Sequence, residues 1–284
     1  MICACRVAVA LVLVTAGGAG QVFAQASEHV TSSIVYELVL SDGSRVYGTV
    51  EKETEEEVVV RTSSGVIVTA QRIQIVTLKP VVGRIVRGEF QRSDPNTTRL
   101  FFAPTGRSLK KGEAYLGVYQ VFVPSLQVGV TDRFSIGGGT PLLIFDDGWE
   151  RPYWITPKVQ VFDSGGVQVA AGVFHAFNPN SEGAGIAYGV ATAGSQTGSI
   201  TGGAGVAYTI DGGRSFVAMF GGDRQIARSI KVITENYIIQ DGNGVLSFGF
   251  RFFGEQLSAD LGLAFPIGAD GLFAFPVVNF VYAF

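Results

Sequence analysis

The sequence predicts an all-β fold: an antiparallel transmembrane β-barrel of about twelve strands, preceded by a small five-stranded β-barrel-like module. Three features predict it, namely long stretches where bulky apolar and small polar residues alternate, an export signal at the N-terminus, and few charges. Of the 284 residues, 47% are hydrophobic, 16% are charged and 38 are glycine. Soluble domains carry about 25% charged residues, so an ordinary cytosolic enzyme is disfavoured. The net charge of −3 provides no basic face for nucleic acid, which we exclude as a partner.

Residues 1–24 have the pattern of a secretory signal peptide. Arg6 precedes an apolar run from Val7 to Ala16, and small residues follow before a cleavage site. A buried N-terminal helix is the alternative, but the segment lacks polar residues at helical spacing. Both cysteines, Cys3 and Cys5, lie inside this segment. The mature chain therefore has no cysteine for a disulfide or a metal site, and no later apolar run approaches the ~20 residues of a membrane helix.

Apolar and polar residues alternate strongly over residues 30–90, and this pattern predicts a module of five short strands. Turn residues at Asp42-Gly43 separate the first two strands. The string Leu-x-Asp-Gly-x-x-x-x-Gly, from Leu40 to Gly48, resembles the opening of Sm-like modules, so the resemblance implies a small SH3-like or Sm-like β-barrel. The RNA-contacting residues of that family are not recognisable, and we use the resemblance for the fold alone. The expected strands are 35–40, 45–50, 58–62, 66–69 and 73–76.

Composition changes after this module, and the change marks a linker over residues 91–112. From Gly112 onward the chain holds 29 of its 38 glycines and most of its aromatic residues. Turn-forming residues at Ser93-Asp94-Pro95-Asn96 punctuate the boundary. Residues 113–284 then form the predicted barrel.

The barrel region reads as a series of hairpins in which one face is bulky and apolar and the other is Gly, Ala, Ser and Thr. A soluble sandwich would place charged residues on its outer face, whereas this pattern fits a wall with lipid outside and a narrow polar lumen inside. Short turns, such as those expected at Ser164-Gly165 and Gly222-Asp223, alternate with longer loops. An exported β-sandwich is the alternative if the first and last segments do not pair. The expected segments are 114–123, 125–131, 133–144, 152–162, 166–177, 183–193, 199–210, 214–221, 225–239, 244–253, 256–266 and 271–284.

The C-terminus places Phe280, Tyr282 and Phe284 at alternate positions. A terminal Phe after alternating apolar residues resembles the C-terminal recognition strand of bacterial outer-membrane β-barrel proteins. The resemblance implies insertion in the outer membrane, contact with its lipid, and reading of these three residues by the periplasmic barrel-assembly machinery through strand addition. The module at residues 30–90 would then lie in the periplasm.

Five charged residues share the inward parity of the barrel strands: Lys158, Lys231, Glu235, Arg251 and Asp260. Charges inside a barrel are costly unless they are paired or hydrated. These residues therefore either form a structural network or line a water-filled path, and we name them as candidate pore-lining residues. Arg251 and Asp260 are expected to meet across a tight turn, which favours a salt bridge.

The sequence offers little for catalysis, and we predict no enzyme, no catalytic residue, no metal site and no cofactor. The mature chain has two histidines, His29 and His175, and His175 falls on the lipid-facing row. Outer-membrane phospholipases resemble this size of barrel, but their Gly-His-x-Ser motif does not occur here. Tyr153 and Trp154 are interpreted, with Trp149, as an interfacial aromatic girdle, with a carbohydrate platform as the alternative.

The favoured function is a narrow porin-like pore for small polar solutes, selected by lumen width and by the five inward charges. A barrel of twelve strands is near the size at which side chains still fill the lumen. The second hypothesis is a structural barrel that anchors the N-terminal module, which would bind a periplasmic protein or the cell wall. The third is an outer-membrane lipid hydrolase.

Overall fold

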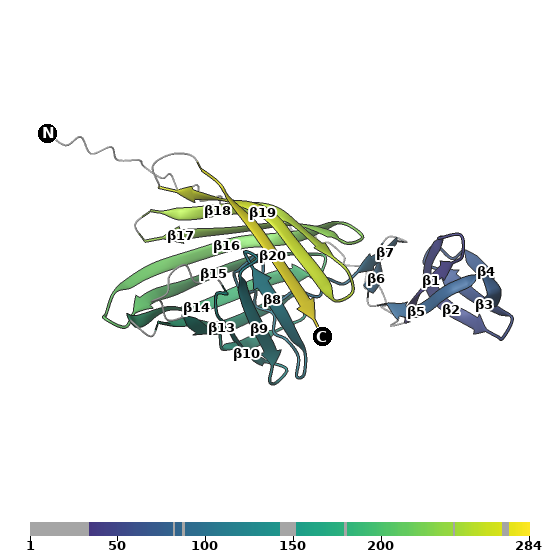
Figure 1. The fold of residues 1–284 in the computed structure, drawn as a ribbon, viewed down its shortest axis with the longest axis horizontal. Coiled ribbons are helices and arrows are strands. Elements are labelled where there is room, and N and C mark those ends of the chain that lie inside the picture. Colours follow the sequence, from purple (N-terminus) through teal and green to yellow (C-terminus); the bar gives the residue numbers. More distant parts are fainter. Residues whose placement is uncertain are drawn as a thin grey trace, which may run out of the picture. The chain divides into compact units, whose positions relative to one another are not determined.

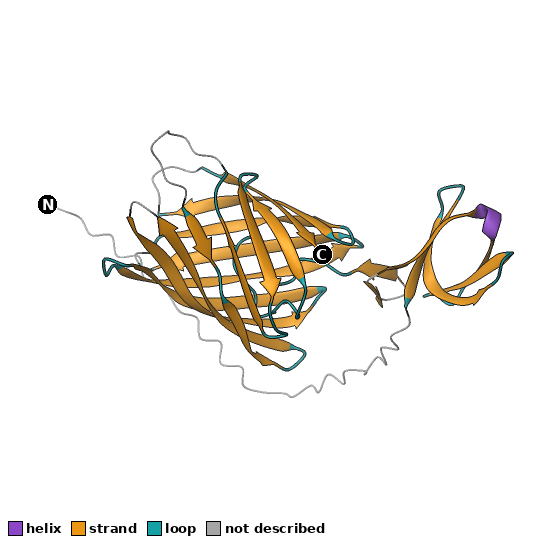
Figure 2. Cartoon of the chain, turned by 60° about the horizontal axis from the view of Figure 1, so that its bottom comes forward, coloured by secondary structure: helices purple, strands orange, loops and turns teal. Residues whose placement is uncertain are grey.

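A computed structural model describes residues 34–284 except 82, 87–88, 143–151, 179–180, 241 and 269–272. The predicted signal peptide at residues 1–24 lies outside these residues, as do His29 and Trp149. The described chain is built almost entirely of strands (Figure 2), and its one helix is a single turn, η1 (Arg72–Gln74). No described helix is long and apolar enough to cross a membrane.

The first five strands form an antiparallel sheet in the order β4-β3-β2-β1-β5, as the sequence predicts for this region. The first turn is made by the predicted residues, because the Ser44 backbone N–H donates to Asp42 Oδ1 over 2.8 Å and Gly43 takes the left-handed φ of 82° that glycine adopts at no steric cost. The strands are β1 (Val35–Leu40), β2 (Arg45–Glu53), β3 (Glu57–Thr62), β4 (Ile67–Gln71) and β5 (Ile75–Val81).

The five-stranded sheet has its own apolar core, formed by the buried side chains of Leu38, Val58, Val60 and Ala70. Each of these residues alternates with a more exposed neighbour, which is the period-2 pattern of a half-buried strand. A two-stranded sheet of β6 (Gly83–Val86) and β7 (Glu89–Arg92) follows in the chain.

The remaining thirteen strands form a closed antiparallel barrel (Figure 1). They begin and end within a few residues of most segments that the alternation predicts. The strands are β8 (Ala114–Tyr119), β9 (Val123–Gly129), β10 (Phe134–Gly139), β11 (Tyr153–Ile155), β12 (Lys158–Asp163), β13 (Val167–Asn178), β14 (Ser181–Ser195), β15 (Gly198–Thr209), β16 (Arg214–Ala227), β17 (Ile230–Ile239), β18 (Gly244–Phe253), β19 (Leu257–Ile267) and β20 (Phe275–Ala283).

The barrel closes where its last strand, β20, pairs with its first, β8. Phe284 and Ala114 exchange backbone hydrogen bonds of 3.0 and 3.2 Å at this seam, so the pairing that separates a barrel from a sandwich is present. β11 and β12 both lie between β10 and β13 and together act as one strand of the wall. The wall therefore has twelve strands, the number that the sequence predicts.

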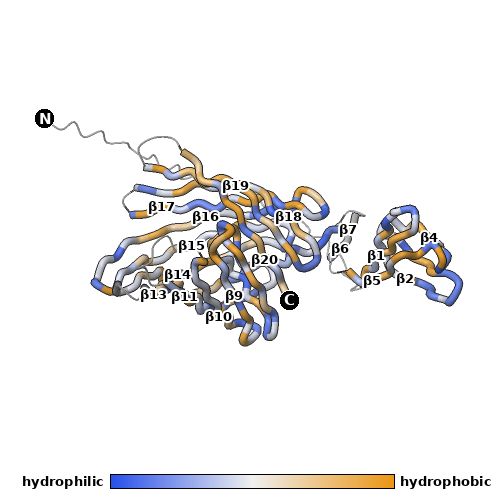
Figure 3. The backbone as a smooth tube through the Cα atoms, viewed as in Figure 1, coloured by the Kyte–Doolittle hydropathy of each residue, from blue (hydrophilic) through white to orange (hydrophobic). Residues whose placement is uncertain are grey.

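Side chains alternate between the outside of the barrel and its lumen, as the sequence pattern predicts. On β18, Phe248 is 54% exposed and Phe250 is 44% exposed, whereas Arg251 is 1% exposed. Figure 3 shows apolar residues along the barrel strands and hydrophilic residues gathered at many strand ends and loops. The outward phenylalanine rings contact mainly one another, as in the stacked pair Phe248–Phe265 with centroids 5.9 Å apart, and they leave an apolar outer surface exposed.

Short connections follow β9, β12, β14, β16 and β18 at one end of the barrel, which we call the tight-turn end. At the opposite end the connections after β10 and β19 are longer, but those after β8 and β15 are as short as the turns, so the predicted regular alternation of short turns and longer loops is wrong. One predicted turn is wrong: Gly222 and Asp223 lie inside β16, where they pair with β17, and the turn falls at Arg228 and Ser229. Gly-Asp has turn composition, but Gly222 faces strand β15 closely, with a Cβ there only 2.6 Å from Ser199 O, and the Asp223 carboxylate is used inside the lumen.

Candidate functional site

The chain between β7 and β8 forms a hairpin inside the barrel, and we call residues 94–109 the lumenal hairpin. Its two arms are joined by Leu100 N–H to Ala103 O and by Thr105 N–H to Thr98 O, each 2.9 Å. At its end the chain is tied to the β9–β10 turn, where Lys111 N–H donates to Asp132 Oδ1 over 3.1 Å. The segment that the sequence predicts as a linker thus also fills part of the lumen.

The tip of the lumenal hairpin packs into an apolar cluster on the barrel wall. Leu100 and Phe101 are fully buried against Ile233 and Val277. Burying a side chain of this size stabilises by about 1.5–3 kcal/mol, so the tip is held by apolar contact as well as by polar bonds.

Glu235 on β17 binds the backbone of the same tip. Its Oε2 accepts hydrogen bonds from the Phe102 and Ala103 N–H groups, each 2.9 Å, and its Oε1 accepts one from the Tyr237 hydroxyl over 2.8 Å. A carboxylate with three donors is well satisfied although it is buried. The carboxylate of Glu235 therefore holds the backbone of the hairpin tip against β17.

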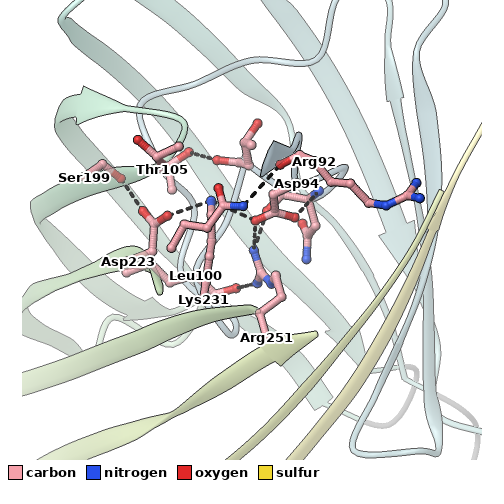
Figure 4. Close-up of polar contacts among 12 residues, drawn as sticks. Arg92, Asp94, Leu100, Thr105, Ser199, Asp223, Lys231 and Arg251 are labelled. Carbon is pink, nitrogen blue, oxygen red and sulfur yellow. Dashed lines mark hydrogen bonds and ion pairs between the residues drawn. The ribbon is translucent and has the colours of Figure 1, made fainter. Parts of the chain in front are cut away.

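Asp94 forms the centre of an ion-pair network at the start of the hairpin (Figure 4). Its Oδ2 lies 3.0 Å from Lys231 Nζ and 3.2 Å from Arg251 Nη1. Lys231 also pairs with Asp223 at 2.7 Å, and Arg251 pairs with Asp260 at 2.6 Å. All five groups are buried, and removing one partner from such a network leaves a charge without compensation.

Arg251 binds the hairpin backbone in addition to these carboxylates. Its Nη2 donates to Leu100 O over 2.6 Å, and its Nη1 donates to Asn96 O. The planar guanidinium thus joins the wall, the start of the hairpin and its tip with one side chain.

The returning arm of the hairpin is bound by β12 and β14. Lys158 Nζ donates to Arg107 O over 2.6 Å, and Gln160 Nε2 donates to Gly106 O over 3.0 Å. The Gly106 N–H donates to the Thr192 hydroxyl over 2.9 Å. Polar side chains of the lumen therefore hold both arms of the hairpin.

Gly106 lets the returning arm approach the wall, because a Cβ at this position would lie 2.2 Å from Gln168 O. We expect Gly106→Val to displace the hairpin and lower the melting temperature of the folded barrel by several degrees. The matched control is Gly166→Val in the β12–β13 turn, where a Cβ meets no atom within 4 Å. Thermal unfolding in detergent, followed by circular dichroism, measures both variants, and equal melting temperatures would contradict the close approach.

The structure brings all five predicted inward charges into the lumen, and it places Arg251 beside Asp260 as the register predicts. Lys158, Lys231, Glu235 and Arg251 contact the lumenal hairpin directly, and Asp260 does so through Arg251. Sequence reasoning missed their partner, Asp94. Asp94 lies among the turn-forming residues Ser93, Pro95 and Asn96. Without the fold, an acidic residue in such a segment looks like part of a solvated loop.

The aromatic and histidine residues near the longer loops separate into two groups. His175 lies on the outward row, where its Nδ1 is 3.0 Å from the Tyr208 hydroxyl. Tyr153 stacks on Phe177 beside it, with ring centroids 4.8 Å apart. The girdle interpretation is wrong for Trp154, which pairs with Ala176 and lines a cavity in the lumen. β11 is too short and irregular for sequence parity to settle its orientation.

A cavity of about 450 Å³ occupies the lumen beside the hairpin. The hairpin contributes Arg99 and Phe102 to its lining, and the wall contributes Trp154, Lys158 and Tyr188. Among the described residues, no group of three or more His, Cys, Asp or Glu side chains could hold a metal ion.

Comparisons with known proteins give no family. No protein-family model matches the sequence, and no curated protein matches it. The KdgM porin is similar in structure, with a TM-score of 0.47 and 7% identity over 61% of this chain and 98% of that chain. The NanC porin has a TM-score of 0.41 and 8% identity over 60% and 97%. An anion-selective porin from Comamonas acidovorans has a TM-score of 0.31 and 12% identity over 88% and 98%.

Proposed function

We propose that this chain is a bacterial outer-membrane pore for small polar solutes, in which the lumenal hairpin is the closing element. The observation that carries the proposal is that the inward charges of the wall bind the hairpin through hydrogen bonds and ion pairs. Such contacts can be exchanged for water. When the hairpin leaves, the same charges become the lining of a hydrated path, and Lys158, Lys231, Glu235, Arg251 and Asp260 then select the solute by charge.

The outer surface supports the membrane location. The outward side chains of β18 and β19 include Phe248, Phe250 and Leu261, which are 44–54% exposed. Exposure of this many large apolar groups in water would drive aggregation. In this proposal lipid of the outer membrane covers them. The tight-turn end then faces the periplasm with the N-terminal module, as short turns do in this class of barrel.

Single-channel recording in planar bilayers tests the proposal. The wild-type barrel is expected to be closed for most of the time. A variant in which residues 95–108 are replaced by a Gly-Ser linker of equal length is expected to give stable conductance steps. The control for a leaking wall is the same linker replacement combined with Lys231→Gln and Arg251→Gln, which removes two lumenal cations. These substitutions should shift the ion selectivity of the conductance steps measurably toward cations.

An anchoring barrel is the second candidate, and the filled lumen favours it. In that case the barrel holds the module at residues 30–90 for a periplasmic protein or the cell wall, and the hairpin is a permanent part of the core. The two functions separate in the recording described above. Silence of a correctly folded, excised barrel would support the anchor and reject the pore.

A further inference from the structure

Arg99, on the lumenal hairpin, indicates a binding site in the cavity that it lines. Its Nε donates to the Tyr115 hydroxyl over 3.0 Å, and its guanidinium carbon lies 4.5 Å from the centroid of the Tyr119 ring. Two tyrosines thus fix the plane of the guanidinium. Among the described residues, neither of its Nη groups has a hydrogen-bonding partner, and no carboxylate lies within 4.0 Å of it. Within the described part of the chain, Arg99 is therefore oriented without a neutralising carboxylate.

The described lining of the cavity carries positive charge without any acid. Arg99 and Lys158 line it, and no Asp or Glu is among the described lining residues. Glu235 is turned toward the hairpin backbone and the Tyr237 hydroxyl instead. A guanidinium in a cavity is stabilised when an anion faces it, and two Nη groups that have no partner among the described residues match the two oxygens of a carboxylate.

The remaining walls of the cavity are mainly apolar. Phe102 from the hairpin, Trp154, Phe174, Ile186 and Met219 from the wall surround the polar end. Trp154 and Phe174 are stacked, with ring centroids 6.2 Å apart. Flat rings favour a planar apolar body through stacking, and a cavity of about 450 Å³ is of the size that holds small organic ligands.

We propose that this cavity binds a small organic anion, a carboxylate with an aromatic body, with the carboxylate on the Nη groups of Arg99 and the ring against Trp154 and Phe174. The proposal does not depend on conduction, because a closed barrel offers the same cavity. Bound ligand would also contact the hairpin that carries Arg99. The site would therefore couple ligand occupancy to the position of the hairpin.

Isothermal titration calorimetry on the full chain in lipid nanodiscs tests this site. The probe is 2-naphthoate, and 2-naphthamide is the uncharged probe of the same shape, each corrected with empty nanodiscs. We expect naphthoate to bind at least tenfold more tightly than naphthamide. Equal affinities, or no naphthoate binding at millimolar concentration, would overturn the proposal. Inorganic phosphate binding as tightly as naphthoate would also overturn it, because the aromatic body would then contribute nothing.

Substitution of Arg99 provides the second test. Arg99→Gln is expected to weaken naphthoate binding at least tenfold and to leave naphthamide binding unchanged. Arg133→Gln is the matched control, since Arg133 is exposed in the β9–β10 turn and loses the same charge. A loss of affinity for both probes in Arg99→Gln would indicate a collapsed cavity and would reject a specific carboxylate contact. The comparison of naphthoate with naphthamide on the wild-type chain tests the proposal without any variant.

Discussion

Asp94→Asn is expected to free the lumenal hairpin and to raise the open probability of the barrel at least tenfold. The substitution removes the carboxylate that Lys231 and Arg251 share, while both cations keep a wall partner in Asp223 and Asp260. Because the cations remain paired within the wall, the lost ion pairs weaken the attachment of the hairpin and not the wall itself. Single-channel recording measures the open probability, and protease sensitivity of residues 94–109 reports release directly.

The matched control for this prediction is Asp211→Asn, in an exposed turn between β15 and β16. It makes the same change of charge far from the hairpin in sequence and is expected to behave as wild type. If Asp94→Asn also stays closed and resists protease, the apolar tip at Leu100 and Phe101 suffices to hold the hairpin. The ion pairs of Asp94 would then not be what keeps the hairpin in the lumen.

Acid adds an independent test of the same contact. Burial by itself raises the pKa of Asp94, but Arg251 and Lys231 outweigh it and hold that pKa below its ordinary value. The stabilisation of the hairpin is therefore complete above the ordinary carboxyl pKa and is lost as the pH falls through the lowered one. Opening of the wild type in strong acid, absent at pH 5, is the expected behaviour.

Phe284→Ser is expected to reduce the amount of assembled barrel in cells at least tenfold. We propose that Phe280, Tyr282 and Phe284 are read during assembly. Phe280 and Tyr282 lie on the outward row of β20 and Phe284 follows its last residue, and each is at least 40% exposed. The serine keeps the backbone bonds with Ala114 at the seam, so a loss of assembly would come from the missing ring. Folded barrel is measured as the heat-sensitive fast-migrating band on a cold gel.

Phe248→Ser is the control, because Phe248 lies on the outward row of β18 and is 54% exposed. It removes the same ring from another strand and is expected to leave assembly within twofold of wild type. Refolding of purified Phe284→Ser in detergent separates recognition from stability. If refolding fails as badly as assembly does, the ring acts on stability alone and the recognition proposal is rejected.

Most of the barrel could be predicted from the sequence because each wall strand repeats one local pattern. From Leu246 to Phe252 on β18 and along β19 the bulky residues and the small or charged ones keep one parity, and the face of each strand follows from that pattern. The pairing of Arg251 with Asp260 followed from the same parity and one short turn. Even the weak first segments were found, since turn residues bound them on both sides.

The lumenal hairpin could not be predicted, for a physical reason. Apolar and polar residues do not alternate regularly over residues 94–109, because their hydrogen bonds go to the wall and to one another and do not form a regular sheet ladder. Asp94 and Arg99 look like residues of a solvated linker. The charged partners of Asp94 are more than 100 positions away in sequence, and the partners of Arg99 are tyrosines of β8. The same limit applies to β16. Gly222-Asp223 has the composition of a turn, and only the fold shows that Asp223 pairs with Lys231 inside the lumen.

The lumenal hairpin begins beside Lys231 and Arg251 and ends beside the β9–β10 turn, so the chain enters and leaves by the same mouth of the barrel. It can be withdrawn as a loop without threading an end through the wall. Tension on the chain before Asp94 acts along that withdrawal path. In the pore proposed above, a force on the N-terminal strands would reach the ion pairs of Asp94 at the entry of the hairpin before it reaches the apolar tip at Leu100 and Phe101.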